Sequence, residues 1–253
     1  HTVCQSAKCP NIHECWGAGT ATIMLLGNLC TRHCKFCSVP HGRPMAVDRD
    51  EPRRVAEAAQ GMKLNHIVLT SVNRDDLPDG GAEIFAETIQ RLRKAIPGLA
   101  IEVLTPDFEG NERAMQTVFE AWPDVFSQAS YGRSLAVLKA GAAWRPKMAI
   151  KSGIMLGMGE LDEEVEQTMV DLYEAGCRIL TLGQYLQPTR HNRPVERYVM
   201  PRAFDAFAET ARKIGYAGVA AGPMVRSSYK AEELLKSALE QDPELVSGRF
   251  AAS

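Results

Sequence analysis

Residues 22–39 read TIMLLGNLCTRHCKFCSV, a short apolar run that passes directly into three closely spaced cysteines. The apolar part, residues 22–26, has the length and the aliphatic, β-branched composition of a buried strand. Cys30, Cys34 and Cys37 follow it with the spacing C-x3-C-x2-C. Three thiolates can hold three irons of a four-iron, four-sulfur cluster and leave the fourth iron open for another ligand. The stretch therefore predicts a reactive cluster in the loop after a strand.

A second, differently spaced triplet precedes it: Cys4, Cys9 and Cys15, in the pattern C-x4-C-x5-C. A structural metal site normally closes its coordination, whereas a reactive site keeps one position free. Two open triplets therefore favour two reactive clusters. Disulfides belong mainly to small secreted domains, so in a chain of 253 residues we expect free thiols and a reducing compartment. Cys177 stands apart, and we assign it to packing.

Composition and charge exclude several classes of protein. Hydrophobic residues make up 45% and charged residues 24%, as in an ordinary globular protein. The net charge of −2 offers no electrostatic attraction for nucleic acid, and no apolar run approaches the roughly 20 residues that span a bilayer. The printed sequence starts at His1. We expect a cytoplasmic protein, or a mitochondrial or plastid one if a targeting segment precedes that residue.

After the cysteines, short apolar runs alternate with amphipathic ones, which is typical of βαβ units in a parallel sheet. The expected strands are residues 22–26, 66–72, 101–104, 124–126, 149–156, 178–182 and 218–221, and the expected helices are residues 52–64, 82–95, 111–121, 133–139, 160–174 and 202–213. We predict an α/β fold, a partial (β/α)6 TIM-type barrel whose N-terminal and C-terminal extensions cap the barrel mouth. The expected domains are residues 1–20, 21–222 and 223–253.

The loops that follow the strands in such a barrel carry its chemistry. The second cysteine triplet lies in one of these loops, and residues 73–81, 157–160 and 184–189 form others. All of them are therefore expected at one mouth.

The C-x3-C-x2-C run, with Phe36 before its last cysteine, resembles the signature of the radical S-adenosylmethionine (SAM) superfamily. The resemblance implies that the open iron chelates the amino and carboxylate groups of SAM, and that reductive cleavage then yields a 5′-deoxyadenosyl radical. A zinc knuckle is the alternative, but zinc sites favour paired C-x2-C units or histidine partners, and no second C-x2-C pair is present.

Five further segments resemble the lipoyl synthase family in its own order: HTVCQSAKCPNIHECW (1–16), VLTSVNRDDLPDGGA (68–82), KSGIMLGMGE (151–160), LGQYLQPT (182–189) and AGPMVRSSYKAEE (221–233). The resemblance implies insertion of two sulfur atoms at C6 and C8 of an octanoyl chain on a lysine of a lipoyl-carrier domain. It also implies two 4Fe-4S clusters, one that binds SAM and an auxiliary one that donates sulfur. The expected partners are a 2-oxo acid dehydrogenase E2 or glycine cleavage H protein and an external electron donor, with no nucleic acid and no membrane, and the protein is expected to be a monomer.

In that family the first triplet carries the auxiliary cluster, and the second serine of the RSSY motif, Ser228 here, is its fourth ligand. A serine oxygen is a weaker partner for iron than a thiolate, which suits a ligand that must leave. The alternative is that Ser227 and Ser228 cap the helix that follows. Arg226 is either a surface charge or, by its place in the motif, a residue that positions Ser228 or substrate.

The resemblance assigns Gly80 and Gly81 to the methionyl amine of SAM, although an Asp-Gly-Gly sequence is also an ordinary turn. Ala82 and Glu83 follow, so the usual Gly-Gly-Glu form is only approximated.

Gly153, Gly157 and Glu160 resemble the G-x-I-x-G-x-x-E element that lies near the adenine, with Met155 in the isoleucine position. A strand followed by a capped helix explains this short pattern nearly as well.

One departure concerns the family segment Asn-His-Asn-x-Glu-Thr-Val, which follows the strand corresponding to residues 124–126. Here Gln128 is followed directly by Ala129, Ser130 and Tyr131. We favour omission of a mobile loop from the sequence over its loss, because a deletion at the barrel mouth should damage the site.

Two rival functions stay open at this point. A methylthiotransferase that modifies tRNA would need a basic RNA-binding module, which the balanced charge does not indicate. A non-catalytic iron–sulfur or zinc protein would bind no SAM and cleave none.

Overall fold

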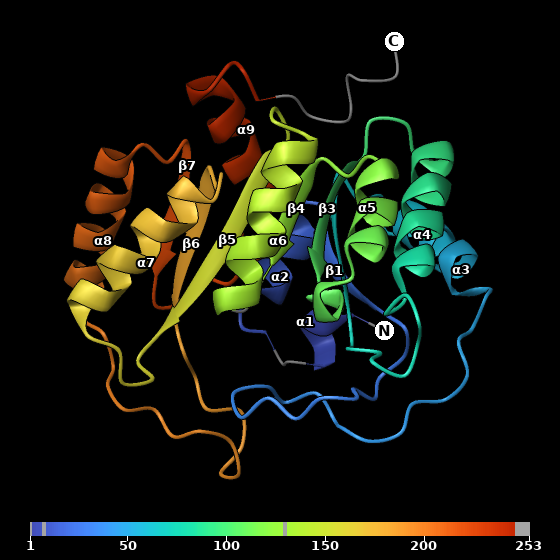
Figure 1. Cartoon of the computed structure of the whole chain (residues 1–253), viewed down its shortest axis with the longest axis horizontal. Helices are drawn as coiled ribbons and strands as arrows, with labels where there is room; N and C mark the ends of the chain where they lie inside the picture. Colours follow the sequence, from blue (N-terminus) through green and yellow to red (C-terminus); the bar gives the residue numbers. More distant parts are fainter. Residues whose placement is uncertain (1, 7–8, 129–130, 246–253) are drawn as a thin grey trace.

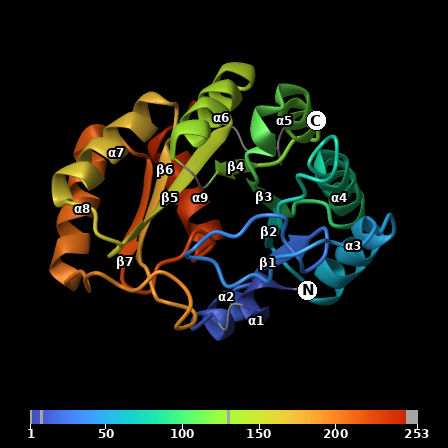
Figure 2. The same cartoon turned by 60° about the horizontal axis from the view of Figure 1, so that its bottom comes forward.

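Seven parallel strands form one sheet in the order of the chain, β1 to β7, in a computed structural model that describes residues 2–6, 9–128 and 131–245. The strands are β1 (Thr20–Leu25), β2 (His66–Ser71), β3 (Ala100–Thr105), β4 (Val125–Gln128), β5 (Ala149–Leu156), β6 (Ile179–Gln184) and β7 (Gly218–Gly222). The sheet curves around its axis, and β1 and β7 are the two ends of its order (Figure 2). The fold is therefore an open barrel, as the sequence predicts.

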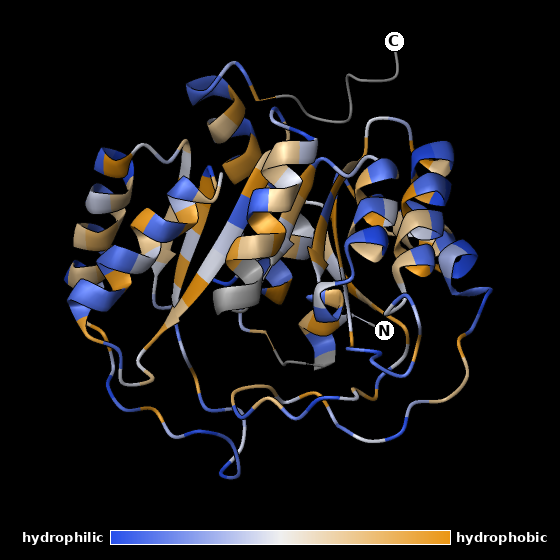
Figure 3. Ribbon diagram, viewed as in Figure 1, coloured by the Kyte–Doolittle hydropathy of each residue, from blue (hydrophilic) through white to orange (hydrophobic). Residues whose placement is uncertain are grey.

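Six helices connect consecutive strands and cover the outside of the sheet (Figure 1). They are α3 (Glu51–Gly61), α4 (Ala82–Ala95), α5 (Glu112–Glu120), α6 (Tyr131–Trp144), α7 (Asp162–Glu174) and α8 (Pro201–Ile214). Except in the largely apolar α6, their apolar sides face the strands and charged residues lie outward (Figure 3), because burial of one helix face drives this packing. In α4 the buried face includes Ile84, Phe85, Ile89 and Leu92.

The lumen of the barrel is closed at the end where the strands begin. The first residues of β3 to β6, Ala100, Val125, Ala149 and Ile179, form a buried cluster with side chains of α9 (Ala231–Gln241). The sequence predicts the C-terminal extension at the mouth, and the structure places α9 at the opposite end instead (Figure 1). The reason is that the apolar residues Leu234, Leu235 and Ala238 fill this floor.

The short helices α1 (Val3–Ser6) and α2 (Ile12–Gly17) lie against β1. Thr2 forms an antiparallel bridge with Ile23, so the N-terminal segment covers part of the free edge of β1. None of the described helices is long and apolar enough to span a bilayer. The predicted interruption after Gln128 falls on residues 129–130, which lie outside the described residues.

Candidate active site at the strand ends

The three N-terminal cysteines come together around one small cavity. Cys4 lies on α1, Cys15 lies on α2, and Cys9 lies between the helices, where its backbone N–H donates to the carbonyl of Cys4 at 2.9 Å. Ser228 lines the same cavity. Burial raises the pKa of the Cys15 thiol, and the neighbouring Cys9 and Cys4 thiols raise it further. The fold therefore holds three thiols near enough to one another to interact electrostatically.

Ser228 reaches this cavity from the segment after β7. Its Oγ accepts a hydrogen bond of 2.9 Å from the hydroxyl of Thr22, which lies on β1. The same segment is tied to α2, because Lys230 forms an ion pair of 3.3 Å with Glu14 and the Tyr229 hydroxyl hydrogen-bonds to that carboxylate. Ser228 lies before α9, which begins at Ala231 with Lys230 as its N-cap residue.

Arg226 also lines this cavity. Its guanidinium donates to the carbonyl oxygens of Pro223 at 3.2 Å and Val225 at 2.7 Å, which bends the chain back on itself. Burial lowers the pKa of Arg226, and the neighbouring Cys9 opposes that shift. Arg226 is therefore a partly buried charge beside the thiols and not a surface side chain.

The second triplet lies in the loop between β1 and α3. The Sγ of Cys30 is buried and accepts backbone N–H groups from Arg32 at 3.4 Å and Asn73 at 3.3 Å. Cys34 and Cys37 are partly exposed, and the Sγ of Cys37 accepts the N–H of Val39 at 3.4 Å. Cys30 is therefore the most buried cysteine of this triplet.

The chemistry of these donor sets fits clusters better than single ions. Among the described residues, no three His, Cys, Asp or Glu side chains gather closely enough for one metal ion. A four-iron cluster is held differently, because its thiolate ligands bind separate irons. Free thiols around one cavity, and N–H groups already directed at a sulfur, suit that arrangement, and all seven cysteines are free.

The glycine pair of the loop after β2 has backbone conformations that favour glycine. Gly80 has a φ of 58° and Gly81 a φ of 90°. A Cβ at Gly81 would overlap the side chain of Leu26. The Asp79 carboxylate accepts N–H groups from Gly81 and Glu83, which starts α4. The turn therefore explains both glycines structurally, and their contact with SAM stays a prediction.

The element predicted to lie near the adenine, Gly153, Gly157 and Glu160, also has a structural role in its own loop. Gly153 lies on β5, where a Cβ would be 2.7 Å from the Thr181 hydroxyl. Gly157 has a φ of 100°. The Glu160 carboxylate accepts the N–H groups of Gly157 at 2.5 Å and Met158 at 2.9 Å, so it closes its own loop. Its contact with a cofactor also stays a prediction.

The sequence reading missed a buried ionic group in the lumen. The Lys151 Nζ lies 3.0 Å from the Glu102 Oε2, and the His66 Nε2 lies 3.6 Å from the same oxygen. All three side chains are at most 2% exposed. Burial by itself would raise the pKa of Glu102, but Lys151 and His66 outweigh it and hold that pKa below its ordinary value. The sequence signal for this group was a charged residue inside each of two apolar strand runs, Glu102 in one and Lys151 in the other.

Two sets of comparisons bear on this site. The Radical SAM superfamily profile matches residues 24–128. The chain is 50% identical to a lipoyl synthase of Rubrobacter xylanophilus, over 94% of this chain and 79% of the relative, and 50% identical to a lipoyl synthase of Glaesserella parasuis, over 92% and 78%.

Solved structures share the fold at low sequence identity. HydG, a maturase of the FeFe-hydrogenase, has a TM-score of 0.63 at 13% identity, covering 89% of this chain and 57% of its own. Streptococcus suis SuiB bound to S-adenosylmethionine has a TM-score of 0.60 at 10% identity, covering 97% and 58%. These likenesses concern the open barrel alone.

Proposed function

The chain belongs to the lipoyl synthase family of radical SAM enzymes, and on that premise we propose how its residues divide the work between two iron–sulfur clusters. The reaction of the family is the insertion of two sulfur atoms at C6 and C8 of a protein-bound octanoyl chain, with SAM and 4Fe-4S clusters as cofactors. Enzymes of this family act on lipoyl-carrier proteins. Membership of this family argues against the two rival functions, a tRNA methylthiotransferase and a non-catalytic metal protein.

Cys30, Cys34 and Cys37 hold the cluster that binds SAM. The other three cysteines, Cys4, Cys9 and Cys15, hold the auxiliary cluster together with Ser228. When bound, the first cluster supplies the electron that cleaves SAM and the second supplies sulfur. The observation that carries this division is that the Ser228 hydroxyl lines the same cavity as the three N-terminal thiols.

Thr22 prepares the serine oxygen for its role. A serine that binds iron must give up its proton, and the resulting oxygen then accepts hydrogen bonds only. The Thr22 hydroxyl already donates to the Ser228 Oγ at 2.9 Å, so this bond persists and strengthens when the oxygen is charged. Arg226 places a positive charge beside the same thiols and positions Ser228 through the bend it makes with Pro223 and Val225.

The glycines and Glu160 complete the SAM side of the proposal. Gly80 and Gly81 form the turn that receives the methionyl amine, and Gly153 and Gly157 belong to the element that receives the adenine, beside the loop that Glu160 closes. The carrier is an E2 component of a 2-oxo acid dehydrogenase or a glycine cleavage H protein, and an external donor supplies electrons. Free thiols at all seven cysteines support a reducing compartment, which is the cytoplasm, or a mitochondrion or plastid if a targeting segment precedes His1.

Ser228→Ala tests the division of labour. We expect the reconstituted variant to form 5′-deoxyadenosine while producing little dithiolated octanoyl-lysine peptide, both measured by mass spectrometry. Ser228→Cys should retain about eight irons per chain, since a thiolate also binds iron, yet release sulfur more slowly. Unchanged lipoyl formation in Ser228→Ala would remove Ser228 from the ligand set. Persistent deoxyadenosine formation in Cys30→Ala would remove Cys30 from the SAM-binding cluster.

A further inference from the structure

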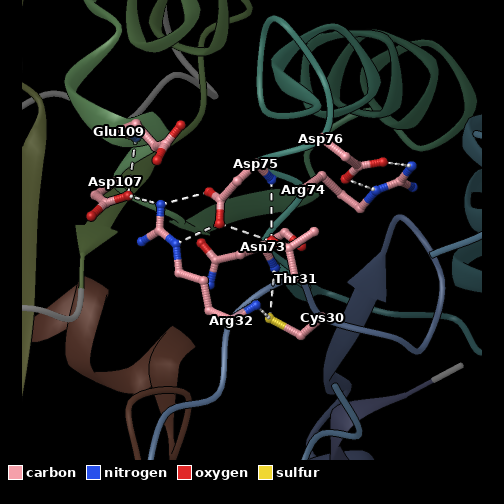
Figure 4. Close-up of polar contacts among 9 residues, drawn as sticks. All are labelled: Cys30, Thr31, Arg32, Asn73, Arg74, Asp75, Asp76, Asp107 and Glu109. Atoms are coloured by element: carbon pink, nitrogen blue, oxygen red, sulfur yellow. Dashed lines mark hydrogen bonds and ion pairs between the residues drawn. The ribbon is translucent and has the colours of Figure 1, made fainter. Parts of the chain in front are cut away.

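Three loops at the strand ends meet at the side chain of Arg32. The guanidinium makes two parallel bonds to Asp75, from Nε to Oδ2 at 2.8 Å and from Nη2 to Oδ1 at 2.6 Å, and Nη2 also lies 2.8 Å from the Asp107 Oδ1 (Figure 4). Arg32 belongs to the cysteine loop, Asp75 follows β2 and Asp107 follows β3. One side chain therefore joins the cysteine loop to two neighbouring strand ends.

The ion pairs of Arg32 with Asp75 and Asp107 are more buried than the ion pairs on the protein surface. The Asp107 side chain is 4% exposed, and those of Arg32 and Asp75 are about one quarter exposed. The hydrogen bond from Arg32 is the main cause that lowers the pKa of Asp75. Arg32 makes a bidentate pair with Asp75 and also contacts the buried Asp107 carboxylate. Ion pairs with this geometry can hold loops in place.

The loops that Arg32 joins also provide two backbone N–H groups that donate to the Cys30 sulfur. The backbone N–H of Arg32 donates to the Cys30 Sγ, and so does the N–H of Asn73, two residues before Asp75. Thr31 reinforces the junction, because its hydroxyl donates to the Asp75 Oδ2 at 2.8 Å (Figure 4). Displacement of the Arg32 side chain would therefore move both N–H donors away from one sulfur.

We propose that Arg32, fastened by Asp75 and Asp107, is a positioning residue that sets the reduction potential of the cluster bound by Cys30, Cys34 and Cys37. The inference rests on the proposed ligand assignment. Hydrogen bonds to the sulfurs and the net charge around a cluster are the main determinants of its potential. Arg32 acts on both: it holds two N–H groups at the Cys30 sulfur, and its positive charge favours the more negative, reduced cluster.

The test compares Arg32→Gln and Arg32→Lys with the parent enzyme in a redox titration followed by electron paramagnetic resonance. SAM perturbs the signal of the cluster with the open iron, which identifies the relevant signal. Arg32→Gln should shift the midpoint of that signal to a more negative potential, since a cation is lost and two backbone N–H donors move away from the Cys30 sulfur. Arg32→Lys keeps the charge but not the bidentate bond, so its midpoint should lie between the two.

The matched control is Arg53→Gln, because Arg53 also pairs with two carboxylates, Asp50 and Glu57, on the exposed side of α3. Its midpoint should equal that of the parent. Hydrogen exchange of the apoproteins adds a readout that needs no cluster: the Asn73 amide should exchange about tenfold faster in Arg32→Gln only. If Arg32→Gln folds but loses its cluster, that faster exchange carries the inference.

A midpoint and an Asn73 exchange rate in Arg32→Gln that match Arg53→Gln would overturn the inference. The proposed ligand set fails separately, if Cys30→Ala keeps the SAM-responsive signal. The two failures are therefore distinguishable.

Discussion

The Thr22 hydroxyl donates a hydrogen bond of 2.9 Å to the Ser228 Oγ across 206 positions of sequence. Thr22 lies on β1, the first strand of the sheet, and Ser228 follows β7, the last. The bond therefore joins the two ends of an open barrel at the cavity that the N-terminal thiols line.

Thr22→Val removes that bond with little change of shape. We expect dithiolation of an octanoyl-lysine peptide to slow by about tenfold, the effect of one hydrogen bond to a charged oxygen, while deoxyadenosine formation continues. The control is Thr88→Val, because the Thr88 hydroxyl donates to the Ile84 carbonyl within α4, away from both triplets. Equal dithiolation rates in the two variants would contradict the positioning of Ser228 by Thr22.

Gly183→Ala should displace the segment that carries Arg226 and Ser228. A Cβ at Gly183 would overlap the carbonyl oxygen of Val225, which is backbone and cannot swing aside. We expect sulfur transfer to fall by more than tenfold, because small misplacement of reacting groups is costly. Gly61→Ala is the control, since no atom lies within 4 Å of a Cβ there. A Gly183→Ala enzyme as active as Gly61→Ala would show that this segment tolerates movement.

Lys151→Met should destabilise the apoprotein by about 3–5 kcal/mol, because it leaves the buried Glu102 carboxylate without its cation. Urea unfolding measures the loss. Lys151→Met/Glu102→Leu should recover part of it, since the double variant buries no charge. A double variant less stable than Lys151→Met would indicate that the carboxylate has a separate structural role.

The pH dependence of the same pair has a defined sign. In the parent protein the pKa of Glu102 lies below its ordinary value, so its stabilising effect is complete above about pH 4.3 and is lost as the pH falls through the lower folded pKa. In Lys151→Met, burial should raise the pKa of Glu102 instead. That variant should therefore gain stability relative to the parent between pH 7 and pH 5, and urea midpoints at both values measure this. If the stability difference between Lys151→Met and the parent is the same at pH 7 and pH 5, the predicted rise of the Glu102 pKa in the variant is wrong.

Cys177 should resist alkylation in the folded apoprotein. Its side chain is fully buried, its Sγ lies 3.1 Å from the Ile179 carbonyl oxygen, and burial raises its pKa to about 12. At pH 8 a reduced sample should therefore incorporate iodoacetamide at the partly exposed Cys9, Cys15, Cys34 and Cys37, with Cys177 labelled only after unfolding. Peptide mapping by mass spectrometry reads each site. Rapid labelling of Cys177 without denaturant would show that this strand opens locally.

The strand and helix pattern was predictable because burial imposes its own period on the sequence. The expected helix 82–95 and strand 149–156 have the bounds of α4 and β5. The helix expected at 160 begins at Asp162, because the Glu160 carboxylate binds the N–H groups of its own loop. The helix expected at 133–139 extends over Tyr131–Trp144 in the structure, because apolar residues all around it obscure the helical period.

The sequence by itself determined the spacing of both cysteine triplets and the alternation of strands and helices, and hence that Cys30, Cys34 and Cys37 follow the end of a strand. Only the tertiary structure decided that Thr22 contacts Ser228, that Lys151 neutralises Glu102, and that Arg32 joins Asp75 and Asp107. The physical reason is that periodicity fixes which way a side chain faces. The partner it meets depends on the curvature of the whole sheet and on the ends of strands distant in sequence.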